Sequence, residues 1–148
     1  MKVKFFSVML AVMLSLAFVS CNNGSTDEPP SLTRLMIVKN ADAIAHNNNP
    51  VTSLRVNEQF GVNFAGTAKT HDIVKYEWII KNAGNVVSSG EVTRSPPYIT
   101  KGTSGGFWIY NYSYWKGSSP GSYSFEFFLV DEKNNESNTR SVSFTVTQ

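Results

Sequence analysis

The chain has 148 residues, which is room for one domain of ordinary size. Hydrophobic residues make up 41% of it and aromatic residues 13%, a content that excludes an intrinsically disordered chain and is typical of β-strands. Two of the thirteen Lys and Arg residues, Lys2 and Lys4, belong to an N-terminal leader, so the remaining eleven balance eleven Asp and Glu residues. A neutral chain with no basic cluster lacks the electrostatic footprint of nucleic-acid binding.

The first twenty residues have the pattern of an export signal. Two lysines give a positive start, and Phe5 to Val19 is an apolar run shorter than the ~20 residues of a membrane-spanning helix. The run ends in Phe18-Val19-Ser20-Cys21, which resembles the lipobox of bacterial lipoproteins, although leucine is more usual where Phe18 stands. The resemblance implies cleavage before Cys21 and a lipid on its thiol. The alternative is an ordinary secretory leader that is cut near a cysteine by coincidence.

Cys21 is the only cysteine, so the chain cannot form an internal disulfide, and it lies where the lipid would be attached. Two or three acyl chains hold a protein on a membrane without spanning it. We expect a signal peptide over residues 1–20, a lipidated cysteine with a flexible tether over 21–31, and one domain over 32–148. The expected location is a bacterial cell envelope, with the lipid anchor in the outer membrane and the domain on its periplasmic or surface face.

Beyond the tether, short runs of β-branched and aromatic residues are separated by Gly, Asn, Ser and Pro clusters, which predicts an all-β sandwich or barrel. Ala41–Ala45 can form one helical turn, and Asn82–Asn85 is a hairpin turn. Ser88–Gly106 predicts an edge strand followed by a mobile loop. The remaining expected strands are Thr33–Val38, Leu54–Val56, Phe60–Gly66, Ile73–Ile80, Val86–Val87, Phe107–Trp115, Ser122–Val130 and a last one through Val142, Phe144 and Val146.

Three segments stand out by their order and spacing: Ile73-Val74-Lys75-Tyr76-Glu77-Trp78, Pro120-Gly121-Ser122-Tyr123-Ser124-Phe125 and Ser143-Phe144-Thr145-Val146. Together they resemble polycystic-kidney-disease (PKD) repeats and related bacterial immunoglobulin-like modules, over the region from Val56 to Val146. The family's usual Phe-Gly-Asp-Gly after the tryptophan is replaced here by Ile79-Ile80-Lys81-Asn82. The resemblance implies an immunoglobulin-like antiparallel β-sandwich of about seven strands, with Trp78 between the sheets and Tyr123 as a tyrosine corner. It also implies a noncatalytic extracytoplasmic module used in adhesion, binding or spacing.

The aromatic strand offers the most suggestive candidate site. Trp108, Tyr110, Tyr112 and Tyr114 share one face of a regular strand, whereas Phe107, Ile109 and Trp115 share the other. If the second set faces the core, the first set forms an outward row, the aromatic strip. Rings spaced ~7 Å apart along a strand can stack on sugars or anchor a partner protein. The alternative is that this face belongs to the core or is covered by the loop before it.

Two weaker candidates concern metals and histidines. Asp131, Asn134 and Glu136 gather oxygen ligands in one turn and form a calcium candidate, which an ordinary hairpin turn explains equally well. His46 and His71 lie in loops without a nucleophile arrangement, so we expect solvated histidines, no catalytic residues and no cofactor. The sequence thus predicts a noncatalytic envelope module that recognises a glycan or a protein. The alternative is a structural accessory or spacer of a larger envelope complex.

Overall fold

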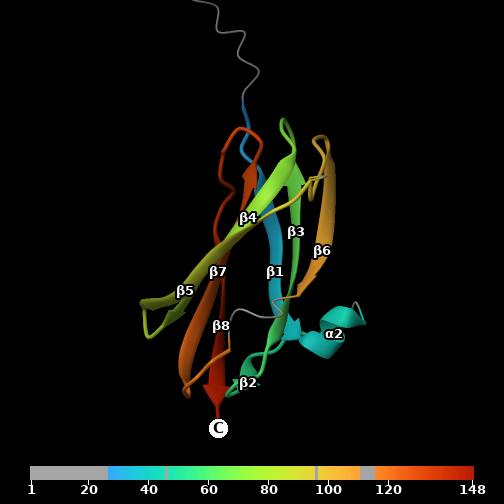
Figure 1. Ribbon diagram of the computed structural model, residues 1–148. Helices are drawn as coiled ribbons and strands as arrows, with labels where there is room; N and C mark the ends of the chain where they lie inside the picture. Colours follow the sequence, from blue (N-terminus) through green and yellow to red (C-terminus); the bar gives the residue numbers. More distant parts are fainter. Residues whose placement is uncertain (1–26, 46, 96, 111–115) are drawn as a thin grey trace, which may run out of the picture.

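The computed structural model describes residues 27–45, 47–95, 97–110 and 116–148, with the backbone alone for Ile44 and residues 106–110. Two β-sheets pack face to face (Figure 1). The first, sheet A, has the strand order β1 (Ser31–Lys39), β3 (Phe60–Ala68), β6 (Thr103–Tyr110). The second, sheet B, has the order β2 (Ser53–Arg55), β8 (Arg140–Thr147), β7 (Gly121–Asp131), β4 (Ile73–Asn82), β5 (Asn85–Thr93). A short helix, α2 (Asn40–Ile44), follows β1, and the whole confirms the expected all-β sandwich.

The structure differs from the sequence prediction mainly in Ser88–Gly106, which was expected to be an edge strand followed by a mobile loop. Among the described pairs, only β2 and β8 are parallel. The expected edge strand is β5, the last strand of sheet B. The loop expected up to Gly106 is shorter, because Thr103–Gly106 pair with Ala65–Ala68 and so belong to β6. Backbone pairing with β3 therefore orders a glycine-rich run that by composition alone is typical of a loop.

Alternating aromatic residues from both sheets fill the core. Phe60 of sheet A packs edge-on against Phe125 of sheet B, with ring centroids 5.5 Å apart. The ring centroids of Phe64 in sheet A and Phe127 in sheet B are 4.8 Å apart. Each fully buried side chain of this size stabilises the fold by roughly 1.5–3 kcal/mol. The buried sets match the predicted alternation on β3, β7 and β8: Phe60, Val62, Phe64, Tyr123, Phe125, Phe127, Leu129, Phe144 and Val146.

Tyr123 forms the expected tyrosine corner. Its hydroxyl donates a hydrogen bond to the Ser119 carbonyl oxygen at 2.9 Å, and only 5% of the residue is exposed. The ring stacks on Phe144, with centroids 5.6 Å apart. The bond connects the entry of β7 to the turn before it, as this motif does in related sandwiches.

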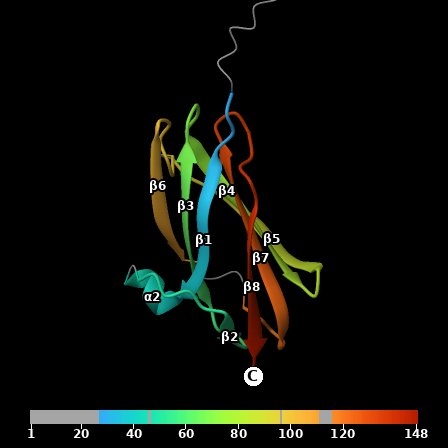
Figure 2. The same cartoon turned by 180° about the vertical axis from the view of Figure 1, so that it is seen from behind.

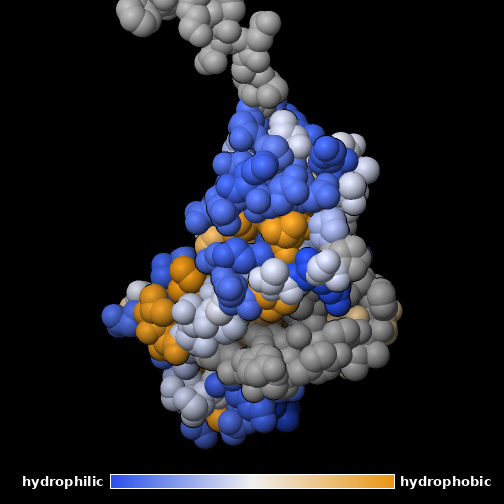
Figure 3. Space-filling model, turned by 45° about the horizontal axis from the view of Figure 1, so that its top comes forward, coloured by the Kyte–Doolittle hydropathy of each residue, from blue (hydrophilic) through white to orange (hydrophobic). Residues whose placement is uncertain are grey.

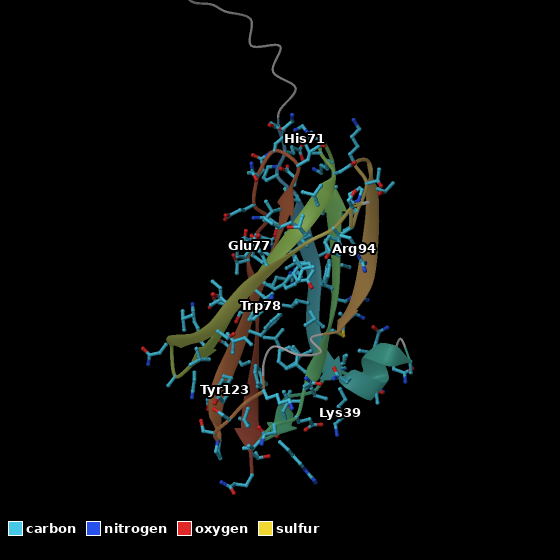
Figure 4. All side chains as sticks on the ribbon, viewed as in Figure 1. Lys39, His71, Glu77, Trp78, Arg94 and Tyr123 are labelled. Atoms are coloured by element: carbon cyan, nitrogen blue, oxygen red, sulfur yellow. The ribbon has the colours of Figure 1, made fainter. Side chains whose placement is uncertain are left out.

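Trp78, predicted to lie between the sheets, is on the same face of β4 as the core residues Tyr76 and Ile80. The ring of Tyr76 reaches sheet A, with its centroid 5.8 Å from that of Phe64. Trp78, labelled in Figure 4, is only partly buried, and its ring stacks on that of Phe125 of the same sheet. A methyl group at Gly90, its register partner on β5, would lie within 2.7 Å of the indole. Because Gly90 has no side chain, the indole can lie directly over β5.

The two ends of the sandwich are built from different segments (Figures 1 and 2). The chain enters at the end that also holds the β3–β4 and β7–β8 turns, here called the N-terminal end. The opposite end, the far end, holds β2 and the C-terminus, and the β4–β5 hairpin projects sideways from the same half of the sandwich. That hairpin turns at Ala83 and Gly84 with φ of 45° and 84°, the left-handed pair that a two-residue hairpin favours. An anchor that precedes residue 27 would lie next to the N-terminal end and would leave the far end directed away from the membrane.

Candidate functional site

The aromatic strip begins on β6, an edge strand of sheet A (Figure 2). The backbone of its first two residues is described: Trp108 is in register with Asn63, and Tyr110 with Gly61 on β3. Tyr112 and Tyr114 lie outside the described residues, so the strip as a whole stays a prediction. The structure does define the surroundings of its first half, which are β3, α2 and the loop before β2.

Asn63, the register partner of Trp108, is a buried polar residue with only 1% of its surface exposed. Its Oδ1 accepts a hydrogen bond from Arg34 Nη2 at 3.2 Å, and its Nδ2 donates to Asn48 Oδ1 at 2.5 Å. Its chain neighbours Val62 and Phe64 face the core, so Asn63 lies on the outer face of sheet A. Polar side chains therefore cover this face beside the strip. Asn63 was not predicted as a site residue, although an asparagine between two core residues of a strand was an available signal.

A shallow groove of about 370 Å³ crosses sheet A on the N-terminal side of this cluster. Three short residues leave the strand backbones accessible there, and the exposed Arg34 contributes a guanidinium. Ser104, on the same strand as Trp108, contributes a hydroxyl. Donors and acceptors of this kind suit a polar ligand that spans several strands. The groove is lined by Thr33, Arg34, Ala65, Gly66, Ser104 and Gly105.

The N-terminal segment is attached to the domain from Asp27 onward, within the expected tether. Lys69 pairs with the Glu28 carboxylate, and Thr70 donates a hydrogen bond to the Glu28 carbonyl oxygen at 2.9 Å. His71 has one ring nitrogen beside Asp27 and the other 3.4 Å from Glu132 Oε1. Its side chain is 20% exposed and lies between these two carboxylates, so it is less solvated than expected. Figure 4 shows His71 at the N-terminal end of the sandwich. His46 lies outside the described residues.

The calcium candidate is a closed turn in the structure. Asp131 is 1% exposed, and its Oδ1 accepts hydrogen bonds from the backbone N–H groups of Lys133 and Asn135, each at 2.8 Å. Its Oδ2 accepts another from the Asn135 side chain at 2.9 Å. Asn134 has a φ of 65°, as expected at the tip of a tight turn. Within the described residues, no three His, Cys, Asp or Glu side chains are grouped to hold a metal ion.

Two core tyrosines have raised pKa values. Burial raises the pKa of Tyr76, the nearby Tyr98 raises it further, and Arg94 opposes the shift. Burial also raises the pKa of Tyr98. The Arg94 guanidinium lies over the Tyr98 ring, with its Cζ 5.4 Å from the ring centroid. Because both rings pack against Phe64 in the core, these shifts reflect packing and do not mark a reactive site.

Neither a protein-family model nor a curated protein matches the chain. Among solved structures, the PKD domain of an M14-like peptidase from Thermoplasmatales archaeon SCGC AB-540-F20 is 15% identical, with a TM-score of 0.48 over 82% of this chain and 99% of that chain. The C-terminal domain of wzt is 14% identical, with a TM-score of 0.57 over 81% and 74%. A Niemann-Pick type C2 protein from the Japanese carpenter ant is 10% identical, with a TM-score of 0.54 over 83% and 96%.

At these identities the similarities concern the fold alone. The chain is an all-β, immunoglobulin-like sandwich, which is the fold class that the sequence motifs implied. In the part of the chain that the structure describes, no helix is both long enough and apolar enough to cross a bilayer.

Proposed function

We propose that the chain is a noncatalytic, lipid-anchored recognition or adhesion module of a bacterial cell envelope, with a glycan or protein ligand. The observation that carries this proposal is the position of β6. This strand carries Trp108 and Tyr110 at the edge of sheet A, and its first half borders the open groove next to Arg34. Aromatic residues beside accessible hydrogen-bonding groups are the combination that recognition surfaces use.

The anchor in this proposal is Cys21. The leader before it has the length and charge of a signal peptide, and the acyl chains would keep the domain on the membrane. Mass spectrometry of the chain purified from bacterial membranes tests this directly. We expect a mature N-terminus at Cys21 that carries a diacylglyceryl group, whereas an unmodified thiol would refute the anchor.

A glycan is the ligand that best fits the surface beside the strip. Sugars present an apolar ring face that stacks on aromatic side chains and hydroxyls that need partners. In the groove, Ser104 and Arg34 supply such partners, and the accessible strand backbones add others. A protein ligand would use the same rings as buried anchors.

The test is retention of the chain on an array of bacterial and host polysaccharides. We expect the double variant Tyr110→Ala, Tyr112→Ala to lose at least about tenfold in retention while its melting temperature stays near that of the wild type. The control is Val92→Ala, which removes an exposed apolar side chain from sheet B and should change neither property. If the double variant unfolds instead, the rings belong to the core and the binding surface is refuted.

The second candidate function is a structural accessory or spacer of a larger envelope complex. It is favoured by exposed valines on β5, since solvent-exposed apolar groups often mark contacts with other chains. Crosslinking in intact cells followed by purification separates the two functions. An accessory would be recovered in a fixed ratio with one other envelope protein, and it would remain so in the Tyr110→Ala, Tyr112→Ala variant.

A further inference from the structure

Among the described residues, no strand pairs with the outer edge of β5, so its hydrogen-bonding groups are open on that side. The β5 strand is the last strand of sheet B, and the Arg94 N–H donates to the Val74 carbonyl oxygen at 3.0 Å. In an antiparallel pair, hydrogen-bonded and non-bonded positions alternate, so Val92, Gly90 and Ser88 bond to β4. The N–H and C=O groups of the residues between them, Ser89, Glu91 and Thr93, therefore point away from β4 toward the open side.

The same strand holds the exposed apolar side chains. Within the described residues, the exposed large hydrophobics are Val86, Val87 and Val92, at 60%, 50% and 38%, and all three lie on β5. The apolar patch at the left of Figure 3 lies where the β4–β5 hairpin extends from the sandwich. An open edge with exposed β-branched residues is the arrangement to which another strand adds.

The edges at β1 and β2 are protected, whereas no described residue covers the edge at β5. The end of β1 is capped by the next segment, because Val38 bridges to Pro50 and the Val51 N–H donates to the Ile37 carbonyl oxygen. The β2 strand at the opposite edge of sheet B has only three residues. In contrast, β5 has nine residues and no proline, and its one charge, Glu91, is neutralised by Lys75 at 3.0 Å.

We propose that β5 pairs antiparallel with β5 of a second copy of this chain, about a two-fold axis at Gly90. This axis brings the open groups of Ser89 opposite those of Glu91 of the second copy, and the Ser89 hydroxyl can donate to that carboxylate. The complementarity occurs twice, because the two-fold axis repeats it. An axis at Ser89 would place Glu91 opposite Val87, and an axis at Glu91 would place two carboxylates opposite each other.

The orientation of the pair has a consequence for the envelope. A two-fold axis perpendicular to a continuous sheet turns one copy end over end, so the two N-terminal ends point in opposite directions. With the proposed anchor at Cys21, upright copies would therefore pair across two facing membranes, as in homophilic adhesion. The strand pairing itself does not depend on the anchor, but this bridging does.

Sedimentation of the full chain carrying Cys21→Ser tests the pairing without a membrane. We expect a concentration-dependent dimer that Ser89→Glu weakens at least about tenfold, because it opposes Glu91 of the second copy. Ser89→Lys should retain or strengthen the dimer. The control is Ser143→Glu, an exposed residue of β8 on the same sheet whose register partner is Ser124, and it should have no effect on the dimer. A wild type that stays monomeric, or equal effects of Glu and Lys at position 89, would overturn the proposal.

Vesicle aggregation tests the bridging. The chain from Cys21 onward, which keeps every described residue, is coupled through its thiol to vesicles that contain a maleimide lipid. This attachment does not require natural lipidation, so failure here is distinct from failure of the proposed anchor. We expect the vesicles to aggregate with the wild type and with Ser89→Lys, and to stay dispersed with Ser89→Glu. A dimer in solution that leaves all vesicles dispersed would overturn the bridging orientation.

Discussion

Replacing Gly66 by alanine measures how closely the two sheets approach. A β-carbon at this position would overlap Leu129 Cδ1 of sheet B and lie 3.0 Å from the Ser31 carbonyl oxygen. The carbonyl is backbone in a paired strand and cannot move far, so the strain must be taken up by Leu129 and its neighbours. Overpacking of this kind costs about 1–3 kcal/mol.

Alanine also lowers the conformational entropy of the unfolded chain relative to glycine, which stabilises the folded state by about 0.4–1 kcal/mol. The expected net loss in the free energy of unfolding is therefore about 1–2 kcal/mol. For a domain of this size that lowers the melting temperature by roughly 3–10 °C, measured by circular dichroism. The matched control is Gly105→Ala, at the register partner of Gly66, where the added carbon would lie 3.7 Å from Ile99 Cγ1 in ordinary contact. If Gly66→Ala and Gly105→Ala have the same melting temperature, the inferred spacing between the sheets is wrong.

Three further changes test the corner, the core and the turn. Tyr123→Phe removes the hydrogen bond to the Ser119 carbonyl and should lower the urea midpoint by an amount worth about 1 kcal/mol, with an unchanged m-value. Because burial raises the pKa of Tyr76 in the folded state, its stabilisation is complete below the ordinary tyrosine pKa and is lost as the pH rises above it. Urea midpoints should therefore fall progressively above about pH 10, and fall less in Tyr76→Phe. Asp131→Ala should destabilise the turn by about 1–3 kcal/mol, Asp131→Asn should destabilise it less because it keeps an acceptor, and millimolar calcium should leave the wild-type melting temperature unchanged.

The parts of the fold that follow from local pattern could be predicted from the sequence. Alternation on β7 gave the buried face from Tyr123 to Leu129, because a strand with one face in the core repeats every two residues. The tyrosine corner was predictable because its partner, Ser119, lies only four residues away. The Ala83-Gly84 turn was predictable because few residues adopt positive φ without cost.

The parts that depend on distant neighbours could not be predicted in this way. The placement of Trp78 is decided by Gly90 across a strand pair, and nothing near Trp78 in the sequence shows that space. Asn63 is hydrogen-bonded to Arg34 and Asn48, which lie 29 and 15 residues away. The attachment of Asp27 depends on His71, 44 residues later. At the candidate site, the sequence could indicate the aromatic strip, but its polar neighbours on β1 and β3 follow from the pairing of strands.

The attachment at Asp27 also bears on how an anchored pair could stand. Only five residues separate Cys21 from Asp27, so a lipid on Cys21, as proposed, would hold the N-terminal end within roughly 20 Å of the membrane. The nine residues of β1 run from that end toward the far end and span about 30 Å. In an upright pair on one membrane, the reversed copy would place its Asp27 about 30 Å above the membrane. The residues between Cys21 and Asp27 can span only roughly 20 Å, so they could not connect this Asp27 to a lipid in that membrane. Upright pairing through β5 is therefore compatible with two facing membranes and not with one.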